Sequence, residues 1–210
     1  RLQLIIGTQI SFGDGKQGSN QNLEPRRKGA KDSFQYPLEG YAKKNEIECE
    51  NHLRVVLLAQ NREGYGNLSE LITRGRRNAE KGEYRLSRND LGKGLEHCLA
   101  LWLPPAQAQP EDVQWLTERF PGRTWIGVEL LARGGDWDRL EALQRLGRQT
   151  GLPLTACGDV HMHVRGRRAL QDIVTCIREH TTIDTAGRLL EANAERHLKS
   201  PQEMMRLFRK

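Results

Sequence analysis

The sequence predicts an α/β fold, on two observations. From Leu95 onward, short apolar runs alternate with amphipathic stretches of helical period, which is typical of parallel strands joined by right-handed crossovers. In addition, the apolar run at residues 152–156 leads directly into Asp-x-His-x-His and then into a helical pattern. Polar residues at such a strand-to-helix connection often form the active site of α/β sheets and barrels. With 210 residues, the chain can form one domain with its own core.

Aliphatic runs predict the strands of this fold. The last of them is entered through Gly151 and Pro153 and has a continuous apolar character, so we expect it to be buried. The predicted strands are residues 1–10, 53–59, 95–103, 124–131 and 152–156.

A first helix is predicted at residues 67–80, after a break at residues 61–66 (NREGYG). Its apolar face consists of Leu68, Leu71, Ile72 and Gly75, and its other face carries Arg74, Arg76 and Arg77. These arginines either face solvent, which is the more common use, or contact phosphate groups.

The later helical patterns carry start or stop signals. Pro110 begins one of them, Gly151 ends another, and Ser200 is an N-cap. The predicted helices are residues 110–120, 137–148, 169–178 and 201–208. In the third of these, one face is apolar and consists of Leu170, Ile173, Val174 and Ile177.

Residues 11–51 differ in kind from the rest of the chain. They are rich in Gly, Lys, Asn, Gln, Glu and Ser without hydrophobic period, which predicts a loop-like insertion. Its triplet Arg26-Arg27-Lys28 is either a solvated charge run or a contact to a phosphate backbone. Because the chain opens directly on an apolar strand, we interpret its start as truncated; the alternative is an edge strand that comes first.

The overall charge favours a polyanionic neighbour. The net charge is +6, the isoelectric point is about 9.3 and the mean hydropathy is −0.70. Nucleic acid fits this charge, although a basic surface kept for solubility fits it as well. The four cysteines form no CxxC motif and are expected to be free thiols in a reducing compartment. Without an apolar span or signal peptide in the sequence, we expect a cytoplasmic protein with no membrane contact.

Asp159 and His161 are the strongest candidates for a functional site. They follow a predicted strand at alternate positions, so their side chains point the same way and offer oxygen and nitrogen ligands to Zn, Mn or Fe. The alternative is that Asp159 caps the next helix and His161 bonds to backbone. His163 is either a further ligand or a plain loop histidine. The adjacent basic residues suit a phosphoester or DNA: Arg165, Arg167 and Arg168.

Other candidates are weaker. Glu129 ends an apolar strand and could be a ligand, a general base or a partner of an arginine; a role in supporting other site residues or the structure is preferred. Cys157 is either a thiolate ligand or a small buried hydrophobic residue. His52 and His97 lie near strand starts, where a structural role is expected, although His52 could still face the site.

Three stretches together resemble a known family: residues 57–71 (LLAQNREGYGNLSEL), 125–131 (WIGVELL) and 152–168 (LPLTACGDVHMHVRGRR). They are similar to the polymerase-and-histidinol-phosphatase (PHP) domain that opens bacterial C-family DNA polymerases, above all the error-prone homologues that act in translesion synthesis. LIIGTQI at residues 4–10 and NAERHL at residues 193–198 also match. The resemblance covers nearly the whole chain except residues 11–51.

This resemblance implies a distorted seven-stranded βα barrel that is incomplete at its N-terminus. Residues 1–198 would form the partial PHP domain, and residues 199–210 would begin the connection to an absent polymerase domain. The family's closing Asp-x-His metal motif falls on Asp159 and His161. Gln9 stands where the family has a glutamate ligand, and residues 11–51 displace His52 by two positions from the family histidine.

The resemblance therefore implies part of a DNA-directed DNA polymerase, a nucleotidyltransferase of damage-tolerant replication and repair. This part would act mainly as a scaffold with a degenerate phosphoesterase site, and a divalent metal (Zn, Mn or Mg) would be bound weakly or lost. Its partners would be DNA, through the parent enzyme, the remaining polymerase domains and other translesion-synthesis proteins. The alternatives are a stand-alone metal-dependent phosphoesterase and a non-catalytic interaction module.

Overall fold

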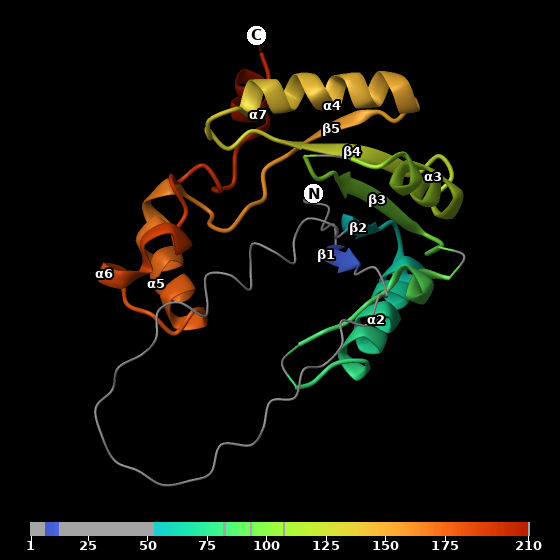
Figure 1. The fold of residues 1–210 in the computed structure, drawn as a ribbon, viewed down its shortest axis with the longest axis horizontal. Coiled ribbons are helices and arrows are strands. Elements are labelled where there is room, and N and C mark those ends of the chain that lie inside the picture. Colours follow the sequence, from blue (N-terminus) through green and yellow to red (C-terminus); the bar gives the residue numbers. More distant parts are fainter. Residues whose placement is uncertain (1–6, 13–52, 82, 93, 107, 210) are drawn as a thin grey trace, which may run out of the picture. The chain divides into compact units, whose positions relative to one another are not determined.

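The computed structural model describes residues 7–12, 53–81, 83–92, 94–106 and 108–209. The chain divides into two compact units, which are described separately. Unit 1 comprises Arg1–Ala100 and Gln107–Gly122, and unit 2 comprises Leu101–Ala106 and Arg123–Lys210. In the described ranges the strands are ordered β1-β2-β3-β4-β5 in one sheet, and β3 (Cys98–Leu103) belongs partly to each unit (Figure 1).

Unit 1 is built on an antiparallel pair of strands. β1 (Gly7–Phe12) runs against β2 (Leu53–Ala59), with Ile10 opposite Val55 and Phe12 opposite Leu53. All four of these side chains are buried, because alternate residues of each strand point to the same face. β2 has the bounds that the sequence predicts.

Helix α2 (Arg62–Arg77) packs against β2 and begins earlier than predicted. The strand does end before residues 61–66, as predicted, but the helix start predicted at residue 67 is wrong. Asn61 caps the helix by accepting a hydrogen bond from the Gly64 N–H at 2.9 Å. Gly64 is needed there: a Cβ at this position would collide with the carbonyl oxygen of His97. Of the predicted apolar face, Leu68, Leu71 and Gly75 are buried, whereas Ile72 is 41% exposed.

The remaining helical elements of unit 1 contribute to the same core. A short 3₁₀ helix (Arg88–Leu91) precedes β3, and α3 (Pro110–Arg119) starts at Pro110 as predicted. The ring of Trp115 lies 5.9 Å from that of Phe12, and the guanidinium of Arg119 stacks on it at 4.4 Å. Leu116 and Phe120 are fully buried.

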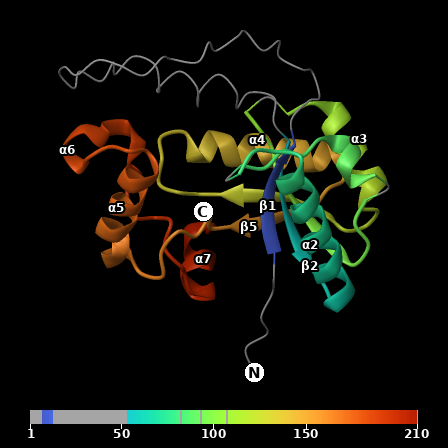
Figure 2. The same cartoon turned by 90° about the horizontal axis from the view of Figure 1, so that it is seen from below.

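Unit 2 contains the predicted strand-helix-strand unit. β4 (Thr124–Glu129) and β5 (Leu154–Cys157) are parallel, and α4 (Asp136–Thr150) crosses between them and packs along both (Figures 1 and 2). Gly151 ends α4 in the left-handed conformation, with φ of 73°. The α/β alternation predicted from the sequence is confirmed for this part of the chain.

β5 is not the buried strand that the sequence predicts. Leu154, Thr155 and Cys157 are only partly buried, and Ala156 is exposed. Among the described strands it lies at the end of the strand order, where it has a described neighbour on one side only. The predicted seven-stranded barrel remains a proposal, since the described residues hold five strands.

The chain after β5 forms short helical elements. α5 (Arg168–Arg178) follows a 3₁₀ turn (Arg165–Arg167), and α6 (Ile183–Ala186) continues into a second turn (Gly187–Leu189). α7 (Pro201–Leu207) is capped by Ser200, as predicted. The apolar face of α5 lies 45–69% exposed, while Thr175 and Cys176 on its other side are buried.

The described cysteines, Cys98, Cys157 and Cys176, are all free thiols, in agreement with the sequence prediction. Among the described helices, none combines the length and the apolar character needed to cross a bilayer.

Candidate functional site

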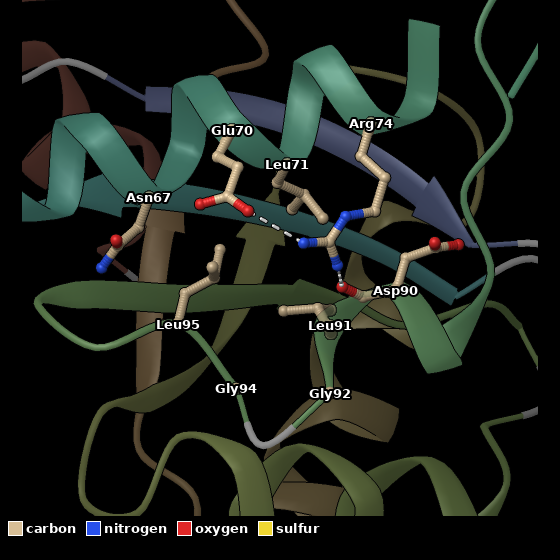
Figure 3. A pocket seen from close by; sticks show the side chains of 9 residues that line it. All are labelled: Asn67, Glu70, Leu71, Arg74, Asp90, Leu91, Gly92, Gly94 and Leu95. Atoms are coloured by element: carbon tan, nitrogen blue, oxygen red, sulfur yellow. Dashed lines mark hydrogen bonds and ion pairs between the residues drawn. The ribbon is translucent and has the colours of Figure 1, made fainter. Parts of the chain in front are cut away.

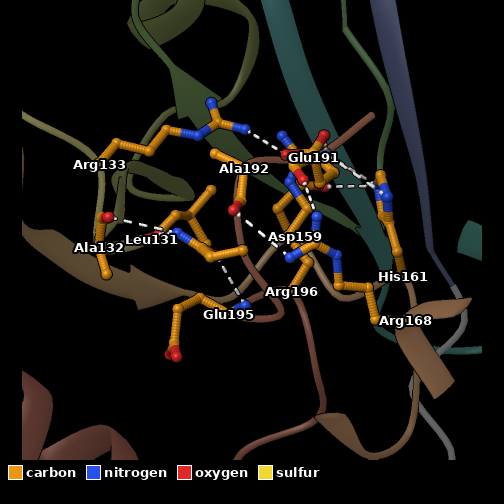
Figure 4. A network of polar contacts seen from close by, with 11 residues as sticks. Leu131, Ala132, Arg133, Asp159, His161, Arg168, Glu191, Ala192, Glu195 and Arg196 are labelled. Atoms are coloured by element: carbon orange, nitrogen blue, oxygen red, sulfur yellow. Dashed lines mark hydrogen bonds and ion pairs between the residues drawn. The ribbon is translucent and has the colours of Figure 1, made fainter. Parts of the chain in front are cut away.

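Asp159 and His161 lie together just after the end of β5, in unit 2. The Nε2 atom of His161 is 3.4 Å from Oδ1 of Asp159 (Figure 4). Asp159 has a φ of 39°, a left-handed conformation that turns the chain sharply out of the strand. Its side chain is only 14% exposed, against 33% for that of His161. The two predicted site residues are therefore neighbours on one side of the chain.

Arg196 contacts both of these residues and Glu191 as well. Its Nη1 atom lies 3.0 Å from Asp159 Oδ2, 3.2 Å from Glu191 Oε1 and 3.2 Å from His161 Nε2. The Arg196 side chain is only 15% exposed. Sequence reasoning missed both Arg196 and Glu191, although Arg196 is part of the NAERHL stretch that resembles the family.

Backbone pairing places Arg196 at the site. Its carbonyl oxygen accepts hydrogen bonds from the N–H groups of His161 at 2.8 Å and Met162 at 3.2 Å, and the Leu198 N–H donates to Met162 at 2.8 Å. Asn193 anchors the start of this segment, because its Nδ2 donates to the carbonyl of Leu131 at 2.7 Å. The NAERHL stretch is therefore fixed alongside the Asp-x-His motif (Figure 4).

His197 is buried beside this site, which the sequence did not indicate. The residue is 5% exposed, and Met162 forms an isolated parallel bridge with it. Its Nδ1 lies 3.0 Å from the Ala194 carbonyl, and Arg165 Nε donates to its Nε2 at 3.4 Å. Both ring nitrogens of His197 are thus engaged within the protein.

The predicted phosphate-binding arginines have protein partners. Arg165 pairs with Glu195 at 3.1 Å, and Arg168 donates to the Glu191 carbonyl at 2.6 Å. Arg167 is exposed. A phosphate would have to compete with these contacts at Arg165 and Arg168, so phosphate binding remains a prediction for this cluster.

Glu129 and Cys157 lie opposite each other on β4 and β5. Burial raises the pKa of the Cys157 thiol to about 11, and the charges of Glu129 and Asp159 add to the shift. Burial also lowers the pKa of Arg139, and the Glu129 carboxylate acts in the opposite direction. Cys157 is thus a thiol at neutral pH, and the charge of Glu129 acts on both Cys157 and Arg139. The role of Glu129 remains a prediction.

The remaining candidates lie elsewhere. Gln9 pairs with Val56 in unit 1 and lines a hollow of about 210 Å³. His97 contacts Glu63 at 2.9 Å at the start of α2. His163 is exposed, and His52 lies outside the described residues.

Two of the three arginines on the polar face of α2 contact other residues of unit 1. Arg74 pairs with Glu70 at 3.0 Å and donates to the Asp90 carbonyl at 2.7 Å, beside a hollow of about 130 Å³ (Figure 3). Arg76 donates to the carbonyl of Glu83 at 2.9 Å. Arg77 is exposed to solvent.

The family resemblance implies a metal, and the arrangement around Asp159 does not fit one. Across the ranges that the structure describes, no three His, Cys, Asp or Glu side chains are grouped to hold an ion. The one positive group against both Asp159 and His161 in Figure 4 is Arg196. A guanidinium in contact with both residues places a positive charge there, which opposes the binding of a second cation.

Comparison with known proteins adds a clear relationship. No family model matches the chain. Over 169 residues it is 50% identical to a protein named error-prone DNA polymerase from Dechloromonas aromatica. It is also 52% and 48% identical, each over 165 residues, to proteins of the same name from Pseudomonas aeruginosa and Methylococcus capsulatus. Each match covers 78% of this chain and 16% of the relative, so the chain corresponds to a small segment of these proteins.

Proposed function

We propose that this chain is the PHP-domain portion of an error-prone DNA polymerase and serves mainly as a scaffold within it. The observation that carries the proposal is the identity of about half its residues to proteins of that name over 78% of its length. The motifs at residues 57–71 and 152–168 add support, because they resemble the PHP domain in particular.

The proposal includes a fold and a setting. Residues 1–198 belong to a βα barrel of the PHP type, and residues 199–210 lead toward the polymerase domains. The partners are those domains, other translesion-synthesis proteins and, through the parent enzyme, DNA in the cytoplasm. The basic net charge of +6 is compatible with that setting.

The contacts of Arg196 favour the scaffold over a stand-alone phosphoesterase. A metal-dependent hydrolase needs its carboxylate and imidazole ligands free to bind the ion that activates water. Here the guanidinium of Arg196 lies within 3.2 Å of Asp159 and His161. This observation supports a degenerate site whose carboxylate and imidazole no longer bind a catalytic metal.

A chimaera tests the scaffold role. The matching segment of the Pseudomonas aeruginosa error-prone DNA polymerase is replaced by this chain, and the purified chimaera is assayed for primer extension past a template lesion. We expect bypass close to that of the unaltered polymerase and none when the segment is deleted. An inactive chimaera that is soluble and folded would contradict the proposal.

The isolated chain provides the second arm of the test. It should extend no primer and should not hydrolyse p-nitrophenyl phosphate or single-stranded DNA with Mn²⁺. Hydrolysis that EDTA abolishes and that Asp159→Asn removes would instead establish the phosphoesterase.

A further inference from the structure

We propose that one exposed flank of α2, together with Tyr84, binds single-stranded nucleic acid by stacking bases on two tyrosines and contacting phosphates with two arginines. This surface, the tyrosine flank, consists of Arg62, Tyr65, Ser69, Ile72, Arg76 and Tyr84. It lies within unit 1 and shares no residue with the site around Asp159. The inference does not rest on the proposed function.

The helical spacing of α2 places five of these residues on one side. Positions three and four apart lie on the same side of an α-helix. The five are Arg62, Tyr65, Ser69, Ile72 and Arg76, and they extend over about 21 Å of the helix. The buried residues Gly64, Leu68, Leu71 and Gly75 precede the last four of them by one position each. The tyrosine flank therefore lies next to the buried face, and Tyr65 is 50% exposed there.

The acidic residues of α2 lie on its other flank. Glu63 contacts His97 at 2.9 Å, and Glu70 pairs with Arg74 at 3.0 Å. Figure 3 shows Glu70 and Arg74 beside residues 90–95. Both carboxylates of the helix are thus engaged away from the tyrosine flank, which carries two arginines and no acid within α2. Such a surface attracts a polyanion.

Tyr84 extends the flank beyond the C-terminal half of α2, beside a hollow of about 210 Å³. The hollow is lined by Gln9, Ile10, Ile72, Arg76, Tyr84 and Leu86. Ile10 and Leu86 are buried, whereas Ile72 and Tyr84 are 41% and 45% exposed. Arg76 donates to the carbonyl of Glu83 at 2.9 Å, which keeps its guanidinium next to the loop that carries Tyr84. A base could stack against the ring here while its phosphate contacts the guanidinium.

The combination of aromatic rings and cations favours a single strand over other partners. Stacking on tyrosine needs unpaired bases, because the bases of a duplex already stack on one another. The turn after α2 adds no net charge, since its exposed residues Lys81 and Arg85 are balanced by Glu80 and Glu83. In a protein interface the two arginines would need acidic partners from the other protein, whereas every phosphate of a strand supplies one.

The test measures binding of fluorescein-labelled oligo(dT) of about 15 nucleotides to the 210-residue chain by fluorescence anisotropy. Tyr65→Leu and Tyr84→Leu keep apolar bulk and remove the ring, so each should weaken binding about 5- to 150-fold. Tyr65→Phe and Tyr84→Phe keep the ring and should bind nearly as well as the unchanged chain. Circular dichroism shows whether each variant is folded.

The arginines are tested by salt dependence between about 50 mM and about 200 mM NaCl. Arg62→Gln with Arg76→Gln should reduce the slope of log affinity against log salt by about 1.4, or about 0.7 for each lost phosphate contact. The matched control is Arg145→Gln with Arg148→Gln, which removes two exposed arginines from α4 in unit 2. This control should leave affinity and slope nearly unchanged.

Three results would overturn the inference. The first is a folded chain that does not bind oligo(dT) at low salt. The second is an equal loss of affinity in the two arginine pairs with no effect of the leucine variants, because net charge alone would then attract the strand. The third is a leucine variant that changes the sedimentation coefficient but not the affinity, which would make the flank a protein interface. If the leucine variants do not fold, the comparison of the two arginine pairs decides. None of these results bears on the scaffold role, which the chimaera tests.

Discussion

The Cα of Gly64 lies so close to the carbonyl oxygen of His97 that the first turn of α2 has no room for a side chain there. The same oxygen accepts a hydrogen bond from the Gln60 N–H at 2.9 Å, so it cannot move away without losing that bond. The start of α2 and the start of β3 are thus held together by a backbone contact.

Gly64→Ala should therefore destabilise the protein. The added methyl group would have to displace backbone and not a flexible side chain, which predicts a loss of about 1–3 kcal/mol in the free energy of unfolding. Gly66→Ala is the matched control, because a Cβ there meets nothing within 4 Å in the same helix. It should be neutral or stabilising by about 0.5–1 kcal/mol. Urea denaturation measures both, and equal effects would contradict this account.

A second prediction concerns the ion pair between Asp159 and Arg196. Because both side chains are about 85% buried, removing either partner alone should cost about 1–3 kcal/mol of stability. In a double-mutant cycle of Asp159→Asn and Arg196→Met in EDTA, the double variant should lose less than the sum. The exposed pair Glu70–Arg74 is the control, with a coupling of about 0.3–0.5 kcal/mol. Additive effects at Asp159 and Arg196 would rule out a direct interaction.

These two contacts also show where prediction from sequence succeeds and where it stops. β2, α4 and α7 were predicted closely because their signals are local: an aliphatic run, the glycine at residue 151 and the cap at Ser200. The start of α2 was missed because a glycine is needed at residue 64 only to make room for the carbonyl oxygen of His97, which is distant in the sequence. Arg196 was missed for the same reason. No pattern within NAERHL says that its arginine reaches Asp159.

The burial of Cys157 predicts a pH dependence. Burial raises its pKa to about 11, so the folded chain holds the thiol proton more tightly than the unfolded chain, whose thiol has a pKa of about 8.5. The resulting stability is fully present below about pH 8.5 and is lost as the pH rises toward 11. Cys157→Ala should lack this loss. Alkylation at pH 8, followed by peptide mapping, should be slower at Cys157 in the folded chain than in urea; equal rates would show an accessible thiolate.

The exposed apolar face of α5 predicts self-association of the isolated chain. Leu170, Ile173, Val174 and Ile177 are each 45–69% exposed on one helix, and contiguous apolar surface of this kind favours association in water. Because these side chains contribute little to the described core, Val174→Lys with Ile177→Lys should leave the melting temperature nearly unchanged. The same variant should shift the sedimentation coefficient toward that of a monomer. Met205→Lys, on α7 and 64% exposed, is the control for a single exposed residue and should not dissociate the oligomer. A monomeric unchanged chain, or a melting temperature that falls sharply in the double-lysine variant, would show that the α5 face is covered within the chain itself.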